Sequence, residues 1–278
     1  MPKKLSAADV KKFHDQGYVC PVPVFDAAEV ADLRRKLAEF EAREGGTLKG
    51  GVRNKPHLFL RWLYDLVTDV TLLDAVEDLI GPDILLYHAQ WFIKEPRTPD
   101  FVSFHQDSAY WSLNEAQGLS AWVAFEPSGP ENGCMQVIPG THKEAMEHED
   151  RRAADNMLWR GQTVKQRIDE SKAVDFVLKP GEMSIHHARI VHGSGPNRSD
   201  RRRIGYSIRY LPAHIARVGT RDSALLVRGK DRWGNFDPEP APKFDYDPDG
   251  VRFHAEMNRR YMEHYMSAEL EQKRTGAR

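Results

Sequence analysis

The chain of 278 residues has the composition of a folded protein, with 40% hydrophobic and 29% charged residues. Forty Lys and Arg against 41 Asp and Glu leave a net charge of −1, so no general basic field favours nucleic acid. We expect neither a membrane span nor a signal peptide, because no apolar run approaches about 20 residues and none follows the basic N-terminus. Only Cys20 and Cys134 are cysteines, which excludes a disulfide framework and favours a cytoplasmic location, whereas twelve histidines make imidazole the main candidate metal ligand.

Residues 1–82 are expected to be mainly helical. Asp26 and Glu29 have the spacing of a capping box and place a helix start between them. The segment 49–61 is basic and rich in glycine, and we consider it either a lid over the site or a solvated loop. The predicted helices cover residues 6–16, 27–44 and 71–79.

After Pro82 the pattern changes to short runs of β-forming residues separated by turn sequences, which indicates an antiparallel sandwich or barrel. The insert 142–172 is polar and expected to contain helix and loop, 231–249 is expected to be irregular, and 251–270 is predicted as a closing helix. The predicted strands cover residues 84–93, 120–125, 134–138, 173–178, 183–192 and 203–211. We therefore predict one domain over residues 1–278, with a helical part (1–82), a β core (83–215) and a C-terminal extension with a helix (216–278).

His105 and Asp107 have a spacing that suits a metal site, because residues two apart on an extended strand point to the same side. His192 ends another predicted strand just before a turn. Two histidines and one carboxylate form the facial triad of non-haem Fe(II) oxygenases, which leaves coordination positions open. Two other interpretations stay open: His105 as a hydrogen-bonded core residue, and Asp107 as the cap of the turn before Tyr110.

The strand that begins at Arg203, eleven residues after His192, has two different faces. Arg203, Gly205 and Ser207 share a small, polar face, and the large apolar residues between them would pack under the helices. A guanidinium that faces a cavity needs an anionic partner, because an unpaired buried charge is costly. A dicarboxylate cosubstrate would supply that partner, since arginine binds carboxylates in a bidentate manner. A surface ion pair is the alternative.

Several longer motifs accompany these residues. They are His105-Gln106-Asp107 with Tyr110-Trp111, Ala121-Trp122-Val123-Ala124-Phe125, Glu131-Asn132-Gly133-Cys134-Met135, Ile138-Pro139-Gly140-Thr141-His142-Lys143, Pro180-Gly181-Glu182-Met183-Ser184, His192-Gly193-Ser194 and Leu226-Val227-Arg228-Gly229. Taken together, they resemble the phytanoyl-CoA dioxygenase family of Fe(II)/2-oxoglutarate-dependent oxygenases, in particular its bacterial, syringomycin-biosynthesis-like branch. The resemblance extends over nearly the whole chain, from about residue 5 to residue 254.

The resemblance implies a mainly β protein with flanking α-helices and a double-stranded β-helix core, a jelly-roll or cupin-like fold. Halogenases of this family replace the carboxylate ligand by a small residue, so the presence of Asp107 favours hydroxylation. We also count Gln90 as a cofactor-binding candidate at the mouth of the barrel, with a structural role as the alternative. The resemblance further implies His105, Asp107 and His192 as catalytic iron ligands, Arg203 as the residue that holds the distal carboxylate of 2-oxoglutarate, and Ser194 and Trp122 as further cosubstrate contacts.

These features predict an enzyme that uses Fe(II), 2-oxoglutarate and O2 to hydroxylate an unactivated C–H bond of a small molecule, with release of succinate and CO2. Whether the substrate is free, a secondary metabolite or tethered to a carrier protein stays open, as does the oligomeric state. The alternatives are the same iron chemistry directed to desaturation or epimerisation, a Zn2+ hydrolase or isomerase on the same barrel, and a non-catalytic metal-binding module. Arg203 and Ser194 argue against the last two, because neither needs a clamp for a dicarboxylate.

Overall fold

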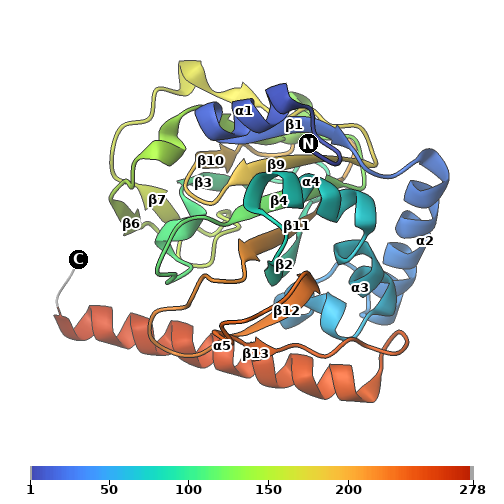
Figure 1. Cartoon of the computed structure of the whole chain (residues 1–278). Coiled ribbons are helices and arrows are strands. Elements are labelled where there is room, and N and C mark those ends of the chain that lie inside the picture. Colours follow the sequence, from blue (N-terminus) through green and yellow to red (C-terminus); the bar gives the residue numbers. More distant parts are fainter. Residues whose placement is uncertain (1, 276–278) are drawn as a thin grey trace.

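The computed structural model describes residues 2–275, with side chains described to residue 263, and has two antiparallel sheets at its centre (Figure 1). The large sheet has the strand order β1-β9-β4-β11-β2-β12-β13, the small sheet has the order β3-β10-β5-β8, and β6 and β7 form a separate pair. Only β12 and β13 are paired in parallel among the described strands. The mainly β, jelly-roll prediction is therefore confirmed. The strands are β1 (Tyr18–Pro23), β2 (Ile84–Lys94), β3 (Val102–His105), β4 (Leu119–Ala124), β5 (Met135–Ile138), β6 (His148–Asp150), β7 (Gln162–Val164), β8 (Val174–Asp175), β9 (Glu182–His187), β10 (Val191–Ser194), β11 (Arg203–Pro212), β12 (Ser223–Arg228) and β13 (Asp237–Pro238).

The helices begin where the sequence supplies caps. Ser6 and Asp9 form a capping box at the start of α1, and Asp26 and Glu29 form the predicted one at the start of α2. No helix in the described part of the chain is long and apolar enough to cross a bilayer. The helices are α1 (Ala7–Gln16), α2 (Ala27–Arg43), α3 (Arg61–Val67), α4 (Val70–Ile80) and α5 (Pro248–Thr275), with short 3-10 helices η1 (Gly50–Arg53), η2 (Pro56–Leu58), η3 (Asp107–Ala109), η4 (Pro130–Asn132), η5 (Thr141–Lys143) and η6 (Glu170–Lys172).

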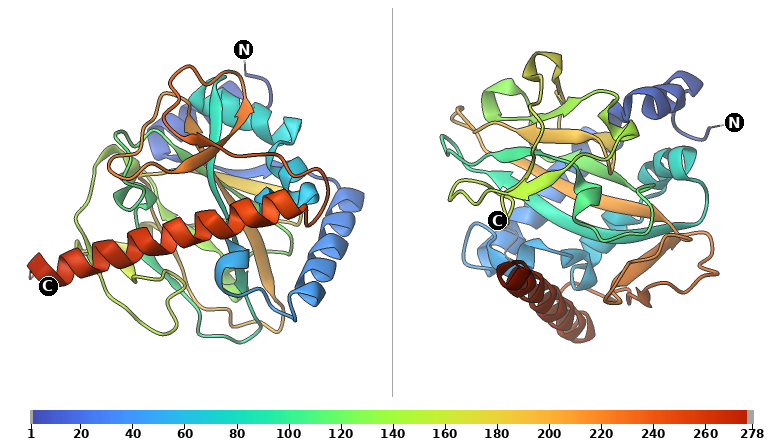
Figure 2. Two further views of the ribbon diagram at one scale, coloured as in Figure 1. Left: turned by 90° about the horizontal axis from the view of Figure 1, so that it is seen from below. Right: turned by 90° about the vertical axis from the view of Figure 1, so that its left-hand side faces the viewer.

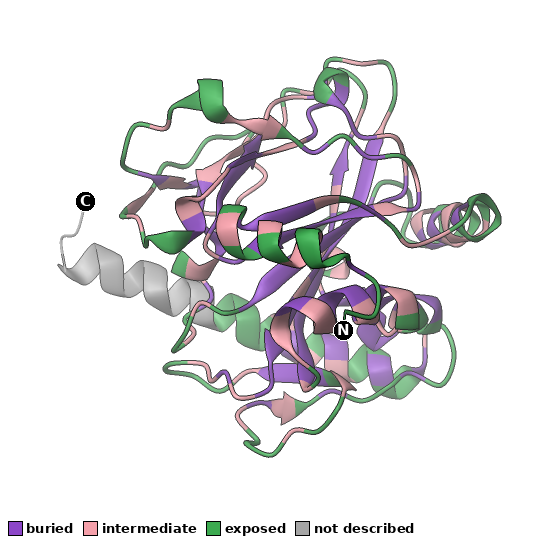
Figure 3. Cartoon of the chain, turned by 45° about the horizontal axis from the view of Figure 1, so that its top comes forward, coloured by how far each residue is buried: buried purple, intermediate pink, exposed green. Residues whose placement is uncertain are grey.

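Helices cover the outer face of the large sheet. Ile204, Tyr206 and Ile208 of β11 belong to the same buried core as apolar residues of α2, α3 and α4, as the alternation in the sequence predicts. Figure 3 shows the strands of the large sheet buried over most of their length, whereas the helices carry both buried and exposed residues. The helix α5 crosses one side of the molecule (Figure 2). The inner face of the sheet is thus left for Arg203, Ser207 and their neighbours.

A β-bulge in β2 sets which of its residues face inward. The register with β11 shifts between Arg209, which pairs with His88, and Tyr210, which pairs with Leu86. After this shift Ala89, Trp91 and Ile93 join the helix-covered core. The side chains between them, those of Gln90, Phe92 and Lys94, point to the inner side of the sheet, where Gln90 and Phe92 line a cavity.

Four sequence-based assignments need correction. Residues 183–192 are not one strand, because a turn at 188–190 separates β9 in the large sheet from β10 in the small sheet. The N-terminal part is not wholly helical, since β1 pairs with β9. The insert 142–172 contains the β6–β7 pair and 3-10 turns but no α-helix. The strand predicted over 173–178 is limited to the two residues of β8. These errors share a cause, because strand pairing depends on partners far away in the sequence.

Candidate metal and cosubstrate site

His105, Asp107 and His192 meet between the two sheets. His105 ends β3 and His192 lies opposite it on the neighbouring strand β10, and their rings are 4.2 Å apart between centroids. Asp107 follows in η3 and not on the strand itself, so the turn, as well as the strand period, brings its carboxylate within 3.5 Å of His105 Nε2. All three side chains are buried, and one ligand atom of each lies within 4.8 Å of the others. This donor set fits Fe(II) with open coordination positions.

Backbone hydrogen bonds orient both imidazoles. His105 Nδ1 lies 2.9 Å from the carbonyl oxygen of Ser103, and His192 Nδ1 lies 3.1 Å from that of Ile190. A carbonyl can only accept, so each Nδ1 carries the proton and each Nε2 keeps a lone pair. Burial holds the pKa of His192 well below its ordinary value, so this imidazole is neutral as a metal ligand requires.

The carboxylate of Asp107 is held ionised and oriented. Burial favours its neutral form, but the Arg209 guanidinium and His105 outweigh this and hold the pKa of Asp107 well below its ordinary value. Arg209 Nη2 lies 3.8 Å from Oδ1, and the Ser120 hydroxyl donates to Oδ2 at 3.0 Å. Such partners around a ligand fix its direction toward a metal.

A narrow cavity runs from the triad to Arg203, which is 3% exposed. Its guanidinium donates to the Gly133 carbonyl, lies 5.3 Å above the ring of Trp122, and has no partner for Nε. Burial lowers the pKa of Arg203 to about 10, which still leaves it charged at neutral pH. A buried cation with no carboxylate of its own fits the distal carboxylate of a dicarboxylate cosubstrate.

Ser194 lines the same cavity and is supported from behind by Lys94. The Lys94 ammonium is fully buried and donates to Ser194 Oγ at 2.7 Å, and also to the carbonyl oxygens of Gly133 and Gly195. Because Ser194 Oγ accepts from Lys94, its own hydrogen is free to point into the cavity. Burial, and next the Arg203 charge, lower the pKa of Lys94 to about 6.

Four residues at the site escaped the sequence-based prediction. Arg209 follows Arg203, Gly205 and Ser207 at the same period of two, so continuing the pattern by one step would have found it. Lys94 and Ser120 gave no local signal, since their partners lie far away in the sequence. The fourth, His186, is 1% exposed, lies 4.6 Å from the His192 ring between centroids and lacks a partner for either nitrogen.

Gln90 lies on the inner face as predicted, but it lines a larger cavity and is not among the residues around Arg203. That cavity has a volume of about 580 Å3 and also reaches His105 and Asp107. Tyr110 and Trp111, which follow the triad in the sequence, form part of its wall.

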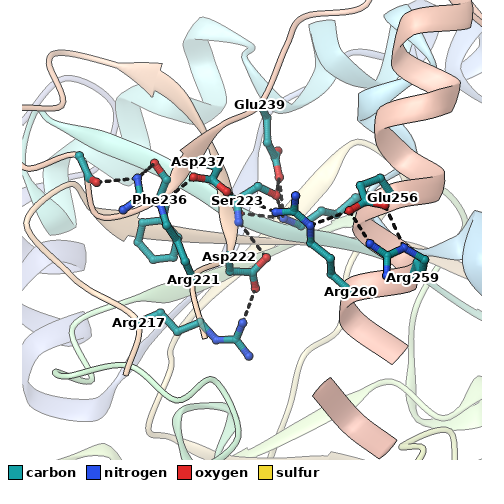
Figure 4. Close-up of polar contacts among 12 residues, drawn as sticks. Arg217, Arg221, Asp222, Ser223, Phe236, Asp237, Glu239, Glu256, Arg259 and Arg260 are labelled. Atoms are coloured by element: carbon teal, nitrogen blue, oxygen red, sulfur yellow. Dashed lines mark hydrogen bonds and ion pairs between the residues drawn. The ribbon is translucent and has the colours of Figure 1, made fainter. Parts of the chain in front are cut away.

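The segment 49–61 is not a solvated loop throughout. Lys55 and His57 are 7% and 0% exposed and form a cluster with Glu239, which accepts from Lys55 Nζ at 2.5 Å and from His57 Nε2 at 3.1 Å. The Ser223 hydroxyl donates to the same carboxylate at 2.7 Å (Figure 4). This cluster ties the segment to β12 and to the chain that follows β13.

Known proteins resemble this chain over most of its length. The family model described as phytanoyl-CoA dioxygenase (PhyH) matches residues 13–205. A probable alpha-ketoglutarate-dependent hypophosphite dioxygenase of Stutzerimonas stutzeri is 26% identical over 229 residues, which cover 72% of this chain and 78% of that protein. The peroxisomal phytanoyl-CoA dioxygenase of Homo sapiens is 30% identical over 161 residues, 54% of this chain and 46% of that protein, so the match spans about half of the human protein. The solved structure of the non-heme monooxygenase ThoJ in its apo form is 29% identical with a TM-score of 0.82, over 93% of this chain and 99% of that one.

Proposed function

Because this chain belongs to the phytanoyl-CoA dioxygenase family of Fe(II)/2-oxoglutarate oxygenases, we propose that it hydroxylates an unactivated C–H bond of a small molecule and releases succinate and CO2. The observation that carries the proposal is the buried His105–Asp107–His192 triad, which a narrow cavity connects to Arg203. The intact carboxylate supports hydroxylation over halogenation, since it occupies the position that a halide would need. The syringomycin-biosynthesis-like branch stays a prediction.

Each residue has a proposed role. His105 and His192 bind Fe(II) through Nε2, and Asp107 binds it through a carboxylate oxygen that Ser120 and Arg209 orient. Bound Fe(II), with 2-oxoglutarate and O2, supplies the oxidant that attacks the substrate C–H bond. Arg203 and the Ser194 hydroxyl hold the far carboxylate of 2-oxoglutarate, and Trp122 forms an apolar wall that keeps water out. Gln90 faces the substrate side in this proposal.

We propose that the chain works as one domain. The cavity of about 580 Å3 takes lining residues from the segment before residue 82, from the β core and from α5. A site built from all three parts needs them to fold together.

Iron binding and turnover test the proposal. Wild-type protein with Fe(II) and 2-oxoglutarate should show a weak visible charge-transfer band without oxygen, and should release succinate in air. His105→Ala and Asp107→Ala should lose both signals, while His214→Ala, which lies next to Trp233 away from the triad, should keep them. Full turnover by Asp107→Ala would contradict the assignment. Tight Zn2+ binding without a band would favour the hydrolase or isomerase instead.

Product analysis separates hydroxylation from the other outcomes of the same chemistry. A hydroxylase incorporates one oxygen atom from labelled O2 into its product. A desaturase or epimerase gives a product without the label, and this result would replace hydroxylation by one of these two reactions.

A further inference from the structure

The cavity of about 580 Å3 beside the triad holds positive charge that its own residues do not balance. Its lining includes Asp107 from the triad and the guanidinium-bearing residues Arg53 and Arg209. A neighbouring cavity of about 300 Å3 shares Arg209 and adds Arg160 and Arg217. Which of these cations already has an anionic partner decides what the cavity can bind.

Two of the four arginines are neutralised within the protein. Arg217 Nη1 donates to Asp222 at 3.2 Å (Figure 4), and Arg160 Nε donates to Asp150 at 2.6 Å. Their guanidinium groups therefore bring no net charge that a ligand must balance.

Arg53 and Arg209 have no such partner among the described residues. Arg53 donates through Nε and Nη2 to the carbonyl oxygen of Trp91, at 3.3 and 2.8 Å, and forms no ion pair. The acidic group nearest to Arg209 is the triad carboxylate of Asp107 at 3.8 Å, and its Nε has no partner. Once Asp107 is committed to a metal ion, both guanidinium groups still need negative charge.

The two guanidinium groups lie along one side of the cavity. Arg209 pairs across the sheet with His88, and the Arg53 guanidinium is anchored on the carbonyl of Trp91, three residues further along β2. Gln90, which lines the same cavity, lies between these two positions on the strand and adds a neutral amide. An anion placed here would meet charged donors from two sides.

The rest of the lining is largely apolar or aromatic. Tyr110, Trp111, Leu158 and Trp159 contribute to the wall, and α5 adds Tyr261. Such a wall suits the body of an organic molecule, and the triad lies at the same cavity, so a bound molecule can present a C–H bond to the metal.

We propose that this cavity binds a small organic anion, a carboxylate or a phosphoryl compound, whose charged group is held by Arg209 and Arg53 while its apolar body lies against the aromatic wall. The proposal names the substrate class of the same site and therefore rests on the proposed function.

Paired acids and amides test the charge requirement. The probes are phenylacetate and hexanoate, each with its neutral amide, and phenylphosphonate as the phosphoryl arm. Binding is measured by calorimetry and thermal shift on protein loaded with Ni(II) and saturating 2-oxoglutarate, so that Arg203 is already occupied. The variants are Arg53→Gln, Arg209→Gln and Arg209→Lys, with Arg160→Gln as the matched control.

At least one acid should bind the wild-type protein about tenfold or more tightly than its amide, since a charge-assisted pair contributes more than a neutral hydrogen bond. Each glutamine variant should lose most of this preference while its affinity for the amide is unchanged. Arg209→Lys should keep part of it, and Arg160→Gln should keep all of it. Comparison of phenylacetate with phenylphosphonate then decides between carboxylate and phosphoryl.

Wild-type protein that binds no acid better than its amide would overturn the anion site, and so would a preference that survives in both glutamine variants. The Fe(II)–2-oxoglutarate band, measured on the same preparation, separates this result from failure of the proposed function. A band without acid preference removes only the anion site, whereas acid preference without a band removes only the oxygenase assignment.

Discussion

Gly205 and Trp122 share one space on the inner face of the large sheet. A Cβ atom on Gly205 would lie 1.8 Å from Cζ2 of the Trp122 indole, which is closer than any real contact allows. The two residues belong to the neighbouring strands β11 and β4, and the indole lies over the position of the missing side chain. The absence of a side chain at 205 thus lets Trp122 lie flat beside Arg203, whose guanidinium is 5.3 Å from the ring centroid.

Gly205→Ala should therefore weaken 2-oxoglutarate binding. The added methyl group must push the indole toward the cavity of Arg203, and we expect the Kd of 2-oxoglutarate to rise about tenfold together with a loss of about 1–3 kcal/mol in stability. Anaerobic titration and thermal melting measure these two effects. Gly195→Ala is the control, because a Cβ there meets nothing within 4 Å. An unchanged Kd in Gly205→Ala would show that Trp122 does not shape the cosubstrate site.

Arg203→Lys should also weaken 2-oxoglutarate binding, although the charge is kept. An ammonium cannot form the two parallel hydrogen bonds that a guanidinium makes with a carboxylate, so we expect the Kd to rise by about tenfold to a hundredfold. The control is Arg202→Lys, since Arg202 pairs with Glu41 and Glu95. Equal affinities in both variants would contradict the role of Arg203.

Ser120→Ala should reduce the affinity for Fe(II) by about tenfold, because the Asp107 carboxylate loses its hydroxyl donor at 3.0 Å. Metal titration by calorimetry measures the effect. Ser184 offers a matched control on the adjacent strand β9, since it is equally buried and its hydroxyl has no partner. Ser184→Ala should leave metal affinity unchanged, and a similar loss in both variants would point to a general packing effect.

The Glu239 cluster should make stability depend on acid pH. Burial alone would raise the pKa of Glu239, but Lys55 and the hydrogen bond from His57 lower it to about 2 from its ordinary 4.5. The unfolded chain therefore binds this proton first as the pH falls, so the stabilisation is complete above about pH 4.5 and is lost progressively toward pH 2. We expect the wild-type protein to lose about 2 kcal/mol from this group between about pH 5 and about pH 3.

Urea unfolding at a series of pH values measures this dependence. Glu239→Gln should be less stable near neutral pH and should show a shallower fall in acid, because the titrating group is gone. Glu126→Gln, which breaks a half-exposed pair with Arg34, should keep the wild-type slope. Equal slopes in wild type and Glu239→Gln would contradict the assignment.

Local patterns in the sequence predicted the parts of this protein that depend on neighbours along the chain. The capping box of Asp26 and Glu29 correctly placed a helix start, because its hydrogen bonds join residues three apart. The period of two in β11 correctly separated the face of Arg203 from the apolar face, because strand geometry alone decides the direction of a side chain.

Only the tertiary structure decided what lies opposite each of these groups. The bulge in β2 turns Lys94 inward to a serine one hundred residues away, and a turn at 188–190 passes the chain from one sheet to the other. No local rule foretells such contacts, since they depend on the pairing of distant strands. The sequence by itself thus determined which residues can bind a metal and an anion, whereas the packing of two sheets decided that they meet, and that Arg53 and Arg209 face the same cavity.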